Sequence, residues 1–326
     1  MAPVIFSLQA IATDDYVRDV LPESYELWGA KRTFERYAGN LRVFADSSYA
    51  KRRQFLRGLR TDGQIVVSCK SYAREVRWKA TLLRATGIGA VFTPPAQRGR
   101  GYATALLGAL LDAERAAGRD LAFLYSDIHP IFYERLGFHA LPSRLLTMRA
   151  ELFGGARVGA QPLGGDDWPA VRRCFDALDR TRPWSLRRTP LVWEWMRRRW
   201  NEPADDGSQP VELVIRNRRA VSAYAIGRRV LREDTFVVDD FAFDGAHGRE
   251  RLHGLLRAAA GDLRRVGGWL PPPGAREALP RGSIRARKDA IMMVVPISAL
   301  GRAWWAQTHE ATLSGSADPG WSADHV

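Results

Sequence analysis

The sequence predicts an α+β protein made of two similar domains in tandem. Its 326 residues correspond to about two domains of ordinary size. Short apolar runs bounded by turn residues, typical of strands, alternate with segments of three-to-four-residue apolar period, typical of helices. Both halves pass through the same coarse order of helices, strands, and then a strand, a loop, a helix and another strand. This shared order predicts two copies of one fold.

The first half, residues 1–152, is expected to form the first domain. Helix signals lie at residues 13–40 and 103–117, and the second helix repeats its apolar positions at Leu106, Leu107, Leu110 and Leu111. The expected strands lie at residues 50–58, 64–70, 87–93, 121–125 and 143–150. Residues 76–84 fit another strand or a connecting element. Thr61-Asp62-Gly63 fits a hairpin turn between the first two strands.

The second half, residues 153–311, is expected to form the second domain after a glycine-rich stretch. Its expected helices lie at residues 168–178, 190–200 and 249–265. Its expected strands lie at residues 211–215, 220–229, 235–243, 267–270 and 291–297. Residues 312–326 are rich in Ser, Gly, Asp and Pro, so a mobile tail is expected there.

Composition excludes several classes of protein. The chain is 46% hydrophobic and 26% charged, as in a globular protein that builds its own core. Cys69 and Cys174 match neither a disulfide framework nor a metal-ligand spacing, so no metal is expected. No apolar run approaches the roughly 18 residues of a membrane span, and no secretory pattern opens the sequence. We expect a cytoplasmic protein with no membrane partner.

The net charge of +13 comes mostly from arginine. An excess of this size attracts polyanions, among them nucleic acids and phosphorylated cofactors. No group of arginines matches a recognisable nucleic-acid-binding motif, so the sequence disfavours a nucleic-acid partner.

The stretch from Gly87 to Leu141 carries the chemistry. An apolar strand there leads into Arg98-Gly99-Arg100-Gly101-Tyr102-Ala103, which opens the leucine-rich helix. The first amides of a helix lack intrahelical acceptors, and the helix dipole adds positive potential there. The two glycines let a phosphate approach the backbone, and the two arginines add cationic donors. A pyrophosphate fits such a loop.

The loop matches neither of two common nucleotide-binding patterns. The dinucleotide pattern needs glycine where Thr104 stands, and no phosphate-binding lysine follows. The spacing Arg-x-x-Gly-x-Ala, from Arg98 to Ala103, instead resembles the coenzyme A loop of the GCN5-related N-acetyltransferase (GNAT) family. A second phrase has that family's spacing: Ser126 ends the next strand, and Phe132-Tyr133 precedes Gly137-Phe138. The resemblance covers roughly residues 55–150.

The resemblance implies an acetyl-CoA-dependent N-acetyltransferase, an acyltransferase of the EC 2.3.1 class. It also implies mixed, mostly antiparallel sheets flanked by helices. Acetyl-CoA would lie in a V-shaped opening between two strands, and Tyr133 would protonate the departing thiolate. A phenol suits that role because its ordinary pKa of about 10 lies above that of a thiol. The expected cofactor-binding residues are Val91, Phe92, Thr93, Arg98, Gly99, Arg100, Gly101, Tyr102, Ala103, Thr104 and Ser126.

The general base stays open at this stage. The attacking amine must be neutral, so a carboxylate, a histidine or a chain of water molecules must accept its proton. The candidates are Asp127, His129 and Glu134 beside Tyr133, and Glu23 and Glu26 in the first helical region.

The acceptor is expected to be a primary amine of a small molecule, such as an amino acid, a polyamine or an aminoglycoside-like compound. The basic surface argues against a polycation unless acidic residues such as Asp239 and Asp240 face the pocket. Trp184, Trp193, Trp195 and Trp200 either line this pocket or form core.

The second half lacks both GNAT phrases, and its loop from Asp244 to Arg249 is only loosely similar. We therefore expect a degenerate GNAT-like domain at residues 153–311. A working domain followed by a degenerate one resembles the first two domains of Eis-type acetyltransferases, whose carboxy terminus reaches into the active site. This chain is too short for their third domain, so no catalytic role is assigned to Val326.

Three alternatives remain open at this stage. The chain could sense acyl-CoA as a regulatory protein, bind nucleic acid, or transfer a longer acyl group. A homo-oligomer is also compatible with the sequence.

Overall fold

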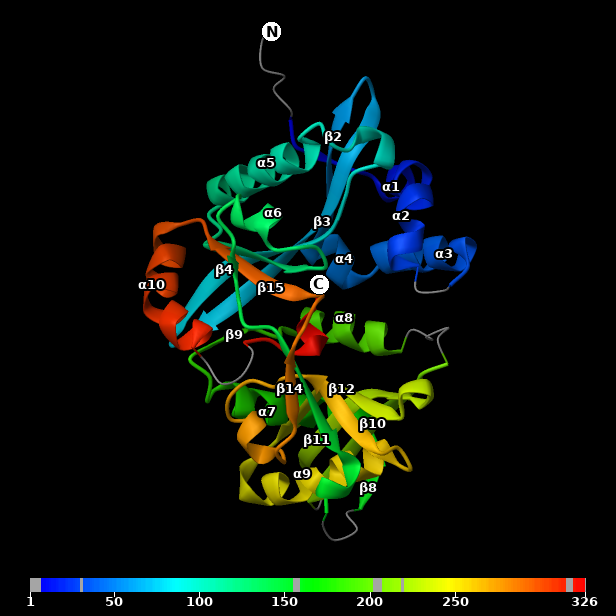
Figure 1. Cartoon of the computed structure of the whole chain (residues 1–326), viewed down its shortest axis with the longest axis vertical. Helices are drawn as coiled ribbons and strands as arrows, with labels where there is room; N and C mark the ends of the chain where they lie inside the picture. The colour runs from blue at the N-terminus through cyan, green and yellow to red at the C-terminus, as the bar shows by residue number, and fades with distance from the viewer. Residues whose placement is uncertain are drawn as a thin grey trace.

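Two sheets lie one above the other along the long axis of the computed structural model (Figure 1). The structure describes residues 7–29, 32–154, 159–201, 207–217, 220–314 and 319–325. Helices flank both sheets, and nearly all strand pairs are antiparallel. The predicted fold class, two mixed sheets of GNAT type flanked by helices, is confirmed.

The first sheet has the strand order β1-β2-β3-β4-β5-β15-β6, with β9 beside β3. Its only parallel pair among the described residues is β4–β5. The strands are β1 (Gln9–Ala10), β2 (Gln54–Thr61), β3 (Gln64–Trp78), β4 (Thr81–Phe92), β5 (Leu121–Ser126), β6 (His139–Ala140), β9 (Trp184–Leu186) and β15 (Ile291–Pro296). The predicted turn at residues 61–63 joins β2 to β3, with Asp62 and Gly63 at positive φ.

The second sheet has the strand order β14-β7-β13-β12-β11-β10-β8. Its parallel pair, within the described ranges, is β12–β13. The strands are β7 (Arg144–Arg149), β8 (Ala160–Pro162), β10 (Gln209–Asn217), β11 (Ala220–Val230), β12 (Thr235–Phe243), β13 (Arg265–Trp269) and β14 (Ser283–Ala286).

The two sheets exchange strands. β7, predicted as the last strand of the first domain, pairs with β13 and β14 of the second sheet. β15, predicted as the last strand of the second domain, pairs with β5 and β6 of the first sheet. The predicted boundary after residue 152 therefore does not separate the two sheets. Hydrophobicity cannot reveal such an exchange, because a strand buries its apolar face equally well in either sheet.

The helices of the first half cover both faces of the first sheet. They are α1 (Thr13–Asp19), α2 (Leu21–Trp28), α3 (Phe34–Ala45), α4 (Ser48–Arg53), α5 (Tyr102–Ala116) and α6 (Ile131–Glu134). The four leucines of α5 are buried with Val67, Ile88 and Leu124 of the sheet, as their spacing predicts. The strand predicted at residues 50–58 is wrong in its first part, because Ser47 caps α4 and β2 begins only at Gln54.

The second half contributes α7 (Trp168–Asp179), α8 (Pro190–Trp200), α9 (Gly245–Ala260) and α10 (Ala299–Leu313). α8 lies between the two sheets, and α10 lies beside the first sheet (Figure 1). The structure thus places elements of the second half against the first sheet as well as the second.

The prediction of a mobile tail is wrong for residues 319–325. The chain ends between the two sheets (Figure 1), with Trp321, Ala323 and Asp324 buried. Arg182 donates a hydrogen bond to the carbonyl of Pro319, and Trp321 packs edge-on against Phe241 at 5.1 Å between ring centroids. Local composition indicated mobility here, but the partners of this segment come from distant parts of the chain.

Candidate active site

The parallel strands β4 and β5 separate at their carboxyl ends. They pair from Ala85 and Leu121 to Ile88 and Leu124 and no further within the described residues. Beyond this point β4 carries a bulge, where Ala90 takes a φ of 49°, while β5 stays paired with β15 up to Ser126. The backbone of Val91 and Phe92 therefore borders the opening between the two strands, and its contact with a cofactor stays a prediction.

The glycine-rich loop lies next to this opening and is exposed. Gly99 and Gly101 adopt φ values of 75° and 77°, a conformation that favours glycine. Gly101 is the N-cap of α5 and no side chain caps this end, so the first amides of the helix point outward. A Cβ atom at either glycine would meet nothing within 4 Å. The glycines therefore serve the turn conformation and leave open space for an anion over the helix end.

A cavity of about 660 Å³ adjoins the opening. Ala90, Val91 and Tyr133 border it at one side, and α2, α3, β2 and β3 supply further walls. Trp195 and Arg199 of α8 and His325 of the tail complete the lining. The cavity is therefore built from both halves of the chain.

Tyr133 lies on the wall of the cavity. It is buried and lines the cavity, and no hydrogen bond to its hydroxyl is recorded among the described residues. Burial raises the pKa of Tyr133 to about 12, and the neighbouring carboxylate of Asp127 contributes. The phenol is thus protonated at neutral pH and can donate a proton.

Ser126 and Asp127 shape the turn after β5. The Ser126 hydroxyl donates to the carbonyl of Ile128 at 2.8 Å and accepts from the Ile128 amide at 3.3 Å. Its hydroxyl is therefore engaged in the turn, and contact with a cofactor stays a prediction for this residue. Asp127 lines the cavity, and its Oδ1 accepts a hydrogen bond from the Ala290 amide at 3.0 Å.

Of the five candidate bases, Asp127 alone borders the cavity. His129, Glu134, Glu23 and Glu26 are exposed and lie outside its lining. His325 is a further titratable group on the wall that sequence reasoning missed. Burial lowers the pKa of His325 to about 3, with Arg199 and Arg287 adding to the shift, so the imidazole is neutral at physiological pH.

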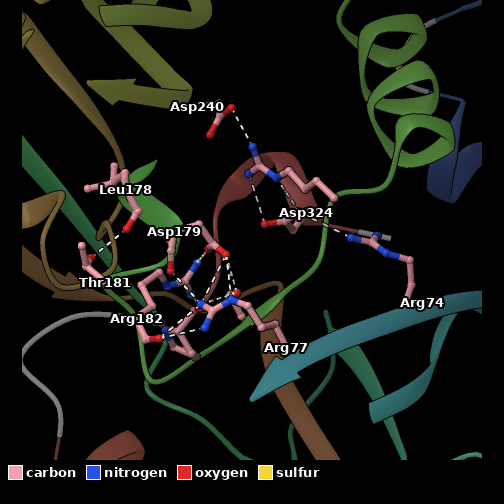
Figure 2. Close-up of polar contacts among 11 residues, drawn as sticks. Arg74, Arg77, Leu178, Asp179, Thr181, Arg182, Asp240 and Asp324 are labelled. Atoms are coloured by element: carbon pink, nitrogen blue, oxygen red, sulfur yellow. Dashed lines mark hydrogen bonds and ion pairs between the residues drawn. The ribbon is translucent and has the colours of Figure 1, made fainter. Parts of the chain in front are cut away.

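The tail that carries His325 is held by a buried ion network (Figure 2). Asp324 accepts from Arg74 of β3 at 3.4 Å and from Arg188 at 3.1 Å. Arg188 also donates to Asp240 of β12 at 2.8 Å. All four side chains are almost completely buried. The network thus joins the first sheet, through Arg74, and the second sheet, through Asp240, to the tail.

Asp239 and Asp240, which would favour a polycationic acceptor if they faced the pocket, do not line the cavity. Asp240 is paired with Arg188 and also accepts from the Tyr224 hydroxyl at 2.8 Å. Asp239 accepts from Ser322 and Arg228, and neither residue lines the 660 Å³ cavity.

Of the four tryptophans considered for the pocket, only Trp195 lines the cavity. Trp193 is completely buried, and Trp184 donates a hydrogen bond to Thr312 at 3.1 Å in the core beside α10. Trp200 stacks on Trp168 at 6.2 Å between centroids. The helical spacing of these residues mainly reflects packing, as the alternative reading allowed.

The described residues contain neither a candidate metal site nor a candidate membrane span. Across the described ranges, no three His, Cys, Asp or Glu side chains are grouped so as to hold a metal ion. No helix in the described part of the chain is both long and apolar enough to cross a membrane.

Comparisons with known proteins support the GNAT resemblance. The sequence model described as "Acetyltransferase (GNAT) domain" matches residues 13–141. No curated protein sequence matches the chain. Several solved structures match the fold over nearly the whole chain.

One is a probable N-acyltransferase from Enterococcus faecalis, with a TM-score of 0.73 and 14% identity over 91% of this chain and 73% of that chain. Another is Eis1 from Mycobacterium abscessus, with a TM-score of 0.60 and 14% identity over 90% of this chain and 74% of that chain. A tandem GNAT protein of clavulanic acid biosynthesis has a TM-score of 0.51 and 13% identity, over 90% of this chain and 99% of that chain.

The sequence match falls on the half that carries the opening, the glycine-rich loop and Tyr133. The structural matches extend the likeness across both sheets. Residues 13–141 therefore match the acetyltransferase domain model of the GNAT family, and the two sheets of the chain have the fold of tandem GNAT proteins.

Proposed function

We propose that this chain transfers an acetyl group from acetyl-CoA to the primary amine of a small molecule by direct attack on the thioester. The observation that carries the proposal is a juxtaposition. The ends of β4 and β5 beyond their last pair and the protonated Tyr133 border one cavity, and the uncapped start of α5 follows β4 along the chain. A GNAT acetyltransferase domain is associated with acyl transfer in general. The residues named here suggest how this chain would bind the donor and protonate the leaving thiolate.

The residues around the opening fit a coenzyme A thioester. Amides from Gly99 to Thr104 would hold the pyrophosphate, because they are exposed at a helix start with space above them. Arg98 and Arg100 would add positive charge. The backbone of Val91, Phe92 and Thr93 would pair with the pantetheine arm along the open edge of β4. The thioester supplies an activated acetyl group.

Two side chains would move the protons. Asp127 would take the proton of the incoming ammonium, directly or through water, because it is the carboxylate of the described cavity lining. Tyr133 would give its proton to the leaving sulfur. Burial raises the pKa of a thiol as well as that of a phenol. The pKa values of the donor, Tyr133, and of the acceptor, the leaving thiolate, are therefore both raised.

The test is thiol release from acetyl-CoA against a panel of amines, with Tyr133→Phe beside the unaltered chain. We expect kcat to fall about 10²- to 10³-fold, the usual contribution of a positioned acid, with little change in acetyl-CoA affinity. Tyr25→Phe is the matched control, since Tyr25 makes ring contacts on α2 and lies outside the cavity lining.

Two results would count against the proposal. An unchanged kcat in Tyr133→Phe would remove Tyr133 as the acid. Failure of the unaltered chain to bind acetyl-CoA by calorimetry would reject the assignment of the loop from Arg98 to Thr104.

A further inference from the structure

The acceptor side of the cavity is strongly aromatic. Beyond the donor end at Ala90 and Val91, its walls come from α2, α3, β3, α8 and the tail. The aromatic side chains of the lining are Trp28, Tyr37, Phe44, Tyr72, Tyr125, Tyr133 and Trp195. Leu27 and Ile128, which also line the cavity, are among the most exposed large apolar residues of the chain. Such walls favour a ligand with a flat or bulky apolar body.

These rings are held in place by their neighbours. Trp195 stacks on Tyr49 at 5.2 Å with an angle of 13° between the ring planes, and Tyr72 lies 6.2 Å from Trp195. Tyr125 meets the His325 ring edge-on at 4.9 Å. The aromatic wall is therefore preformed, so a ligand need not order it on binding.

The charged groups of the described lining are mostly positive. Arg32, Lys70 and Arg199 are cationic, whereas Asp127 is the single carboxylate. His325 adds no charge, because its imidazole is neutral. Arg199 lies 4.8 Å from the Trp195 ring and donates to the carbonyl of His325, so its charge is fixed in the wall. Arg32, Lys70 and Arg199 also make further contacts within the protein, and these contacts leave the three side chains positively charged.

This charge pattern opposes a polycation. A polyamine or aminoglycoside would bring several ammonium groups to a site with one carboxylate and three cations. The same cations favour a ligand that carries an anionic group, and a carboxylate matches a guanidinium in geometry. The volume of about 660 Å³ lies within the range of cavities that enclose a small organic ligand.

We propose that the acceptor is a primary amine on an aromatic body that also carries a carboxylate, as in an aromatic amino acid. The inference rests on the function proposed above and specifies its substrate class. In this arrangement the rings hold the apolar body, the cationic wall holds the carboxylate, and the amine points towards Asp127 and the opening.

The test compares four acceptors at saturating acetyl-CoA: phenylalanine, phenethylamine, alanine and spermidine. Phenethylamine lacks only the carboxylate, alanine lacks only the ring, and spermidine is a polycation. We expect kcat/KM for phenylalanine to exceed that for each of the others at least tenfold, with N-acetylphenylalanine identified by mass spectrometry.

Two variants test the cationic wall. Arg199→Gln and Lys70→Gln should each lower the kcat/KM ratio of phenylalanine to phenethylamine at least threefold. The ratio is insensitive to partial unfolding, which lowers both rates equally. Arg302→Gln, an exposed arginine of α10 outside the cavity lining, should leave the ratio unchanged.

Several outcomes would overturn the proposal. Spermidine as the best acceptor, alanine equal to phenylalanine, or a ratio unaffected by both variants would each do so. If acetyl-CoA binds and another amine is acetylated, the substrate class fails but the proposed function stands. If acetyl-CoA fails to bind, both fail. If it binds and none of the four amines is acetylated, the substrate class fails, and the wider amine panel decides the proposed function.

Discussion

The two sheets of this chain build the same opening and use it differently. In the first sheet, β4 and β5 separate after Ile88, and the space leads into a cavity of about 660 Å³. In the second sheet, β12 and β13 pair only up to Val238 and Gly268, and β12 also carries a bulge there. That opening holds Trp321 and Ser322 of the tail, and a cavity of only about 20 Å³ remains.

The helix starts that follow these strands also differ. α5 begins with exposed glycines that have space around them. The first residue of α9, Gly245, is also exposed with nothing within 4 Å of a Cβ atom, but one turn later a Cβ atom at Gly248 would lie 2.1 Å from the carbonyl oxygen of Ser222. The two openings thus differ in access, because that of the first sheet leads into a cavity whereas that of the second is filled by the tail. Access to the opening, rather than the strand geometry itself, distinguishes the half we propose to be catalytic.

The largest expected effect comes from emptying the second opening. Trp321→Ala removes a buried indole and should lower the free energy of unfolding by about 3–5 kcal/mol. The chain should still bind one acetyl-CoA, because the start of α9 remains packed on β11. Thermal unfolding and calorimetric stoichiometry check the two parts. A stoichiometry of two would show that the tail alone keeps the second half from binding.

A comparable loss is expected from the ion network that holds the tail. Asp324→Asn leaves the buried guanidinium of Arg74 without its carboxylate, which should cost about 3–5 kcal/mol of stability. Because His325 adjoins Asp324 and lines the cavity, the KM for the acceptor should also rise. Asp234→Asn, which alters an exposed pair with Arg264, is the control and should scarcely change Tm. An unchanged Tm in Asp324→Asn would refute the network's role.

A smaller effect is expected from matched substitutions at the starts of α5 and α9, which compare the two helix starts directly. Gly101→Val places a branched side chain at a φ of 77° over the start of α5, so we expect the KM for acetyl-CoA to rise about tenfold, which is about 1.4 kcal/mol. Gly245→Val sits at a φ of 63° at the start of α9 and carries a similar strain. Its KM for acetyl-CoA should stay unchanged. Equal effects of the two variants on KM would contradict the comparison.

An effect on the pH dependence of stability is also expected. The folded state holds His325 neutral down to about pH 3, whereas the unfolded chain protonates it near pH 6.5. Between these values the unfolded state binds more protons, so stability falls as the pH falls, by up to about 1.4 kcal/mol per pH unit. His325→Gln should flatten the decline between pH 6.5 and 4 in denaturant titrations. A profile identical to that of the unaltered chain would show that His325 is not the group responsible.

Much of the first half could be predicted from local pattern. The leucines of α5 repeat at helical spacing, and the glycines at 99 and 101 indicate a positive-φ turn, so the loop and helix were found from a few residues. Tyr133 was found because its spacing to Gly137 and Phe138 is a local phrase. The structure places Tyr133 on the cavity wall and the glycine-rich loop between β4 and α5.

The far wall of the cavity had no such signal. Trp195 was considered only within a group of four tryptophans, and nothing local marked Arg199, Tyr125 or His325. Their shared feature is position: α8 and the tail meet the first sheet only after the whole chain has folded. The single available hint was the Eis-type resemblance, in which the carboxy terminus reaches into the active site.

The sequence by itself determined the fold class and the glycine-rich loop, because both depend on periodicity or on contacts between near neighbours, whereas the role of Tyr133 was implied by the GNAT resemblance. Tertiary structure decided which sheet received β7 and β15, where the tail lies and which opening stays accessible. Those outcomes depend on contacts between distant residues, such as Asp324 with Arg74, and on Trp321 occupying one of two similar openings. An apolar strand or a buried tryptophan loses the same area to solvent in either half, so only the packing partner decides where it lies.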